Sequence, residues 1–118
     1  MPSITRNSFT QGFPPWGFVA GSITGAASTP AFTGIGSSLA AGDISVTDNG
    51  TGDYSLVIAN FQGNKGTAYG FGNAQTLGNF VCPVAYSYSG TTLTLRFKVS
   101  DAAGAAADDT INVQVWAA

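Results

Sequence analysis

The chain has 118 residues, 44% of them apolar, and this length and apolar content predict a single domain with one hydrophobic core. Charged residues make up only 8% of the chain, against roughly 25% in an average soluble protein. With four cations and a formal net charge of −2, the chain lacks the Lys and Arg side chains that nucleic-acid binding or a polybasic membrane anchor needs. We therefore expect no nucleic-acid partner and no membrane partner.

The scarcity of charge also predicts what the surface contacts. Charged side chains are depleted at the core of protein interfaces because they are costly to desolvate. A surface of Ser, Thr, Asn, Gly and small apolar groups therefore favours contact with neighbouring subunits. The alternative is a hydroxyl-rich β surface in a secreted protein, although residues 1–12 have no apolar region of a secretory signal.

Residues 1–43 are rich in Gly, Ser, Thr, Ala and Pro and show weak periodicity, so we expect an N-terminal arm and edge segment. Two prolines fix an extended backbone there, and three nearby aromatic residues need burial. An arm laid over a neighbouring subunit would bury them; an edge strand over residues 17–23, packed on its own core, is the alternative. The arm's candidate interface residues are Phe13, Pro14, Pro15, Trp16 and Phe18.

Residues 44–118 alternate apolar and polar residues in bursts typical of β-strands. A first strand, 44–47, leads through the turn 48–53 into a second, 54–59, so we expect a hairpin. A glycine-rich connection with one strand follows over residues 60–78.

The strongest strand pattern lies over residues 91–100, after a strand over 79–87. Leu93, Leu95, Phe97 and Val99 share one face there. A last strand, 110–116, places Ile111, Val113 and Val115 inward and Asn112 and Gln114 outward. These strands and turns predict an all-β fold in one structural unit, an antiparallel β-sandwich or jelly roll with an extended N-terminal arm.

The residue inventory argues against catalysis. The chain has neither His nor Glu, so the commonest general base and the partner of a nucleophilic Ser or Cys are missing. The only cysteine, Cys82, lies in an apolar stretch and is predicted to be an inert core thiol. Asp48, Asn49 and Asp53 do not have the spacing of a calcium loop and are better explained by a capped turn. We expect no catalytic residue, no cofactor and no metal.

Two further pairs of residues have two interpretations each. Tyr86 and Tyr88 alternate with small residues, so both rings lie on one face of their strand. Exposed aromatic rings anchor interfaces or stack on sugars, whereas core packing is the alternative, and the pattern leaves open which face contacts solvent. Arg96 and Lys98 either pair with a neighbour's carboxylates or belong to a solvated face.

An apolar strand follows a turn with the sequence Asp48-Asn49-Gly50-Thr51-Gly52-Asp53-Tyr54, and a closing strand lies near residues 113–116. Over residues 44–118 this pattern resembles the C1q-like and other jelly-roll domains of phage fibres and capsid decoration proteins. The resemblance implies a domain that forms trimers and, for a short stand-alone member, a position on the outer surface of the capsid. The N-terminal stretch lacks the repetitive shaft of a fibre, which favours a decoration protein.

We therefore expect a virion structural protein, made in the host cytoplasm, that stabilises a phage head as a capsid decoration or cement protein. Its partners would be the major capsid protein or other virion proteins, and its copies would form a homo-oligomer, with a trimer favoured. The alternative is a fibre-tip or other binding module that recognises a cell-surface glycan or receptor. The aromatic candidates for that role are Tyr69, Phe71, Tyr86 and Tyr88.

Overall fold

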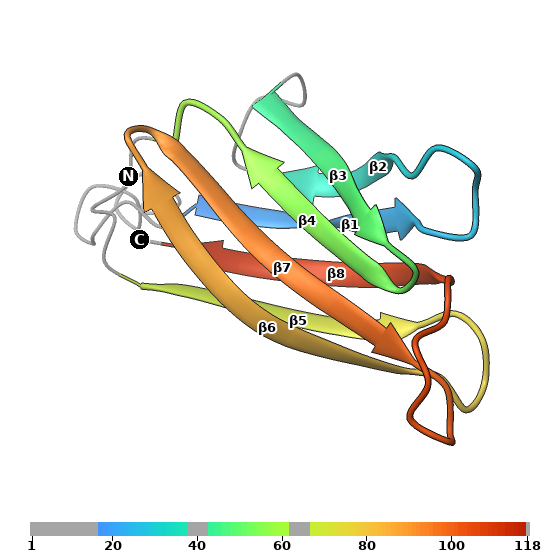
Figure 1. Cartoon of the computed structure of the whole chain (residues 1–118). Helices are drawn as coiled ribbons and strands as arrows, with labels where there is room; N and C mark the ends of the chain where they lie inside the picture. The colour runs from blue at the N-terminus through green and yellow to red at the C-terminus, as the bar shows by residue number, and fades with distance from the viewer. Residues whose placement is uncertain (1–16, 38–42, 62–66, 118) are drawn as a thin grey trace, which may run out of the picture.

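The computed structural model describes residues 17–37, 43–61 and 67–117. These residues form eight β-strands, and none of the three ranges contains an α-helix. The strands make two four-stranded sheets that pack together (Figure 1). Every pair of neighbouring strands is antiparallel. The predicted fold class, an all-β antiparallel sandwich, is confirmed.

Sheet A has the strand order β2-β1-β8-β5, and sheet B has the order β3-β4-β7-β6. Sheet A is made of Phe32–Ser37 (β2), Gly17–Thr24 (β1), Thr110–Ala117 (β8) and Ala68–Ala74 (β5). Sheet B is made of Ile44–Gly50 (β3), Asp53–Ile58 (β4), Thr92–Ser100 (β7) and Phe80–Ser89 (β6). The outermost strands meet in pairs, so that β5 and β6 run along one edge of the sandwich (Figure 1).

The core lies between the two sheets and follows the predicted alternation. Leu93, Leu95, Phe97 and Val99 of β7 are all buried, whereas Arg96 and Lys98 between them are exposed. Strand β8 buries its alternate apolar residues in the same way and exposes Asn112 and Gln114, as predicted. The remaining fully buried large side chains are Tyr54, Leu56, Ile58, Phe61, Ile23 and Val19.

The predicted hairpin is present, and the strands predicted over 79–87 and 91–100 form a second one. Strands β3 and β4 pair around the turn at residues 51–52, and β6 and β7 pair around Gly90. In the first turn the amide of Gly50 donates to Asp48 Oδ1 at 3.0 Å. This short-range bond is the turn chemistry expected of an Asp in that position.

Strand β1 differs from its expected place. The alternative of a strand over residues 17–23 packed on the chain's own core is correct, with Val19 and Ile23 buried. Its edge position is wrong, because β1 is hydrogen-bonded to β2 on one side and β8 on the other and is an inner strand. The alternation of Val19 and Ile23 was hidden by Gly21, which occupies an inward position of the same face. A Cβ at Gly21 would lie 2.5 Å from the Phe32 ring. The ring of a neighbouring strand therefore fills the space that a side chain would occupy.

Strand β5, the strand of the glycine-rich connection, also has inward glycines whose space is filled by side chains of other strands. A Cβ at Gly70 would lie 3.1 Å from the Phe97 ring, and one at Gly72 would lie 2.9 Å from Val81. Large side chains of sheet B thus fill the core beneath this strand. Of the predicted arm residues, Phe18 lies in β1, and Phe13, Pro14, Pro15 and Trp16 lie outside the described residues.

Candidate functional site

The large exposed apolar side chains gather on one edge of the sandwich. They belong to β5, to the loop between β5 and β6, to β6 and to the end of β8. Those on this side are Tyr69, Phe71, Leu77, Phe80, Val84, Tyr86 and Trp116. We call this region the β5–β6 edge. The opposite edge, made by β2 and β3, contributes none of them among the side chains that the structure describes.

An aromatic row crosses the outer face of sheet A. The strand register places Tyr69 of β5 beside Trp116 of β8, and Trp116 beside Phe18 of β1. The Phe18 and Trp116 rings lie 4.4 Å apart between centroids with an interplanar angle of 45°. Tyr69 is 53% exposed, so the row is open to solvent at its β5 end.

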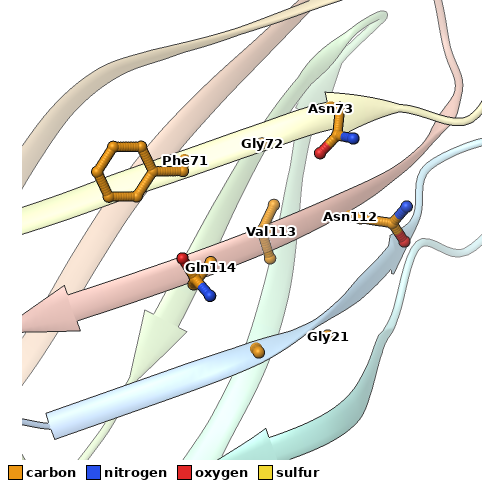
Figure 2. A pocket seen from close by; sticks show the side chains of 8 residues that line it. Gly21, Phe71, Gly72, Asn73, Asn112, Val113 and Gln114 are labelled. Carbon is orange, nitrogen blue, oxygen red and sulfur yellow. The ribbon is translucent and has the colours of Figure 1, made fainter.

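Beside this row the outer face is hollowed (Figure 2). The hollow has a volume of about 280 Å³, and its walls are built by β5, β8 and β1. Phe71 and Asn73 of β5 and Asn112 and Gln114 of β8 project from the same face, whereas Val113 points to the other side of the sheet (Figure 2). The Ser22 hydroxyl donates to Asn112 Oδ1 at 2.9 Å.

A second hollow of about 190 Å³ opens between β5 and β6, where Tyr69 and Tyr86 line opposite sides. The structure resolves the open question about the tyrosine pair. Tyr86 is 44% exposed, whereas Tyr88 is half-buried and packs on Phe61, with centroids 5.9 Å apart. Burial, and then the neighbouring Tyr86, raise the pKa of Tyr88. Tyr86 therefore belongs to the surface and Tyr88 to the rim of the core.

The prediction that Cys82 is a core thiol is wrong, because Cys82 is exposed. It pairs with Lys98 in the β6–β7 register and shares the outward face of that residue. The apolar stretch around it conceals an ordinary alternation that a register shift between Pro83 and Ala85 interrupts. The thiol is therefore exposed because it lies on the outward face of sheet B.

Arg96 forms an ion pair within the chain. Its guanidinium holds Asp53 through two hydrogen bonds, and Asn49 Nδ2 lies 3.4 Å from the same carboxylate. Arg96 lowers the pKa of Asp53, and this effect outweighs burial, which alone would raise it. The two hydrogen bonds explain why a carboxylate that is nearly buried stays charged.

Asp108 and Asp109 hold loops in place. Asp109 accepts hydrogen bonds from the Thr76 amide and hydroxyl, from Asn79 Nδ2 and from the Thr110 amide, at 2.8 to 3.0 Å. Burial alone would raise the pKa of Asp109, but these bonds outweigh it and lower the pKa. Asp108 Oδ1 accepts from the Gly52 amide at 2.8 Å. Across the described ranges, no three His, Cys, Asp or Glu side chains are grouped as a metal site would require.

Sequence reasoning singled out Phe18, Tyr69, Phe71 and Tyr86, and the structure places all four on or beside the β5–β6 edge. It missed Trp116, Asn73, and the contribution of Asn112 and Gln114 to a hollow. These residues meet only through the pairing of β5, β8 and β1. The available signal was the alternation of Tyr69, Phe71 and Asn73 with glycines on the other face of the same strand.

Comparison with known protein families, with curated proteins and with solved structures found no match to this chain. In the described part of the chain, no helix has the length and hydropathy needed to cross a membrane. The support for the candidate site is therefore the arrangement of its residues in the structure.

Proposed function

We propose that this chain is a non-catalytic structural protein that packs against other protein subunits through its β5–β6 edge. In this proposal it acts on the capsid surface of a virion, as a decoration or cement protein. The observation that supports the proposal most strongly is the gathering of exposed apolar side chains on one edge, where Phe80 is 60% and Phe71 55% exposed. Patches of this kind mark interaction surfaces on folded proteins.

The backbone of the same edge supports a subunit contact. Among the strands that the structure describes, β5 has one hydrogen-bonded neighbour, β8, so none of the described strands pairs with its other side. Strand β6 carries Pro83 and a register shift, two features that blunt an exposed edge. Strand β5 has no proline, no charged residue and no register shift. It is therefore the side of the edge that can accept a strand or a loop from another subunit.

The distribution of charge supports the same contact. The carboxylates of Asp53, Asp108 and Asp109 are all engaged by groups of the chain itself. Strands β5 and β6 themselves carry no charged residue, so a partner that covers their exposed apolar side chains need not desolvate a charge of these two strands.

Many copies that each make a modest contact gain avidity when they bind a repetitive surface such as a capsid. The proposed partners are the major capsid protein or other virion proteins, together with further copies of this chain in a trimer. Phe13, Pro14, Pro15 and Trp16 remain proposed contact residues of the N-terminal arm.

The test of this proposal is light scattering on the purified protein over a range of concentrations. The wild type is expected to form a discrete oligomer, and the double variant Phe80→Ser, Val84→Ser is expected to be a monomer with an unchanged circular dichroism spectrum. Thr47→Ser on β3 is the matched control and should behave as the wild type. A wild type that stays monomeric, or an oligomer that the double variant leaves intact, would count against the proposal.

A further inference from the structure

We propose that the hollow on the outer face of sheet A binds a neutral carbohydrate. The hollow combines an exposed aromatic ring with several planar amides, and this is the pairing of groups that a sugar ring needs. Phe71, which is 55% exposed, lines the hollow together with Asn73, Asn112 and Gln114 (Figure 2). The ring offers an apolar face to the C–H groups of a pyranose, and the amides offer partners to its hydroxyls.

The amides have hydrogen-bonding capacity left for a ligand. Asn73 and Gln114 make no side-chain hydrogen bond within the described ranges. Asn112 Oδ1 accepts from Ser22, and this bond turns the Nδ2 group away from β1. A carboxamide donates through its nitrogen and accepts through its oxygen. The three amides therefore match sugar hydroxyls, which also donate and accept.

The absence of charged residues in the lining of the hollow favours a neutral sugar over an anionic one. None of the residues that line the hollow is charged. A sialic acid, a sulfated sugar or a phosphate would lose its hydration here without gaining a cation. A neutral hexose or pentose unit does not incur that cost. The lining thus distinguishes this site from a nucleic-acid or phosphopeptide site.

The surface continues beyond the hollow in a direction that suits an oligosaccharide. Tyr69 precedes Phe71 by two residues on the same face of β5, so their Cα atoms lie roughly 7 Å apart along the strand. Tyr69 adjoins Trp116, which is also exposed. An oligosaccharide bound along β5 would place one unit on Phe71 and the next towards the aromatic row.

The experiment screens the purified full chain against an array of neutral, sialylated and sulfated oligosaccharides. Calorimetry then measures the affinity for the neutral oligosaccharide that binds best. Phe71→Ala is expected to weaken this affinity by at least about tenfold, the loss typical of a truncated anchor. Gln114→Ala is expected to weaken it about three- to tenfold. Phe80→Ala removes an equally exposed ring of the other sheet and should leave the affinity unchanged.

Three results would overturn the proposal: no neutral oligosaccharide binds, only acidic ones bind, or Phe71→Ala binds as the wild type does. If Phe71→Ala and Gln114→Ala change only the oligomeric state, the outer face of sheet A belongs to a subunit contact instead. The outcome is independent of the test at Phe80 and Val84, because neither residue lines the hollow.

Discussion

Arg96 on β7 holds the nearly buried carboxylate of Asp53 on β4 through two hydrogen bonds, from Nε to Oδ1 at 2.8 Å and from Nη2 to Oδ2 at 2.5 Å. The two bonds join neighbouring strands of sheet B on its outer face. One of the four cations of the chain is thereby paired with a carboxylate of the chain itself.

Stability is expected to fall in acid because the pKa values of Asp53 and Asp109 are lowered in the folded state. The unfolded chain then binds protons more readily, so the contribution of these groups is present above the ordinary pKa of 3.8. It is lost as the pH falls below that value through the folded-state pKa values. Urea denaturation at a series of pH values measures this loss. In the double variant Asp53→Asn, Asp109→Asn, the free energy of unfolding should decrease less as the pH falls. A decrease as steep as that of the wild type would contradict the role of these two carboxylates.

Stability is also expected to fall in strong base because of Tyr54. Burial, and then the hydrogen bond to Asp108, raise the pKa of Tyr54 from 10.0 to about 12. Its hydroxyl lies 3.0 Å from the Gly25 carbonyl and 3.0 Å from Asp108 Oδ1. The unfolded tyrosine ionises first, so the stabilisation is complete below pH 10 and is lost between pH 10 and about 12. Denaturation of Tyr54→Phe should show less loss in this window, and identical curves would refute the role of the hydroxyl.

Gly52 is expected to tolerate no side chain. Its φ is +62°, and a Cβ would lie 2.5 Å from the Val99 carbonyl oxygen. Gly52→Ala should therefore lower the free energy of unfolding by at least about 2 kcal/mol, from backbone strain together with the clash. Gly90 is the matched control, because it has a φ of +60° but nothing within 4 Å of the added Cβ. Gly90→Ala should lose only about 1 kcal/mol. Equal losses in urea denaturation would contradict this account.

How far the sequence predicts the fold depends on what occupies the inward positions of each strand. In β7 and β8 those positions carry Leu, Phe, Ile and Val, so a period of two is visible and the burial was predicted correctly. In β1 and β5 several inward positions are glycines, Gly21, Gly70 and Gly72. Phe32, Phe97 and Val81 of other strands fill the space. No local pattern shows that a side chain of another strand completes the face, so the sequence does not identify β1 as an inner strand.

The candidate site was predictable only in part for the same reason. Single exposed aromatic residues such as Tyr69 and Phe71 could be identified from alternation. Their combination with Gln114 and Asn112 depends on the pairing of β5 with β8, two strands about 40 residues apart in the chain. The exposure of Cys82 depends on the β6–β7 register, which places it beside Lys98 on the outward face of sheet B. Strand order is a property of the whole fold rather than of any one segment.

The reactivity of Cys82 measures most directly whether the β5–β6 edge is covered in an assembly. This single cysteine is exposed on β6, between the exposed residues Phe80 and Val84. We predict that a thiol reagent labels it rapidly in dilute protein and at least about tenfold more slowly once light scattering shows the oligomer. The double variant Phe80→Ser, Val84→Ser should be labelled rapidly at every concentration. Equal labelling rates for monomeric and oligomeric wild type would contradict the proposal that this edge is the subunit contact.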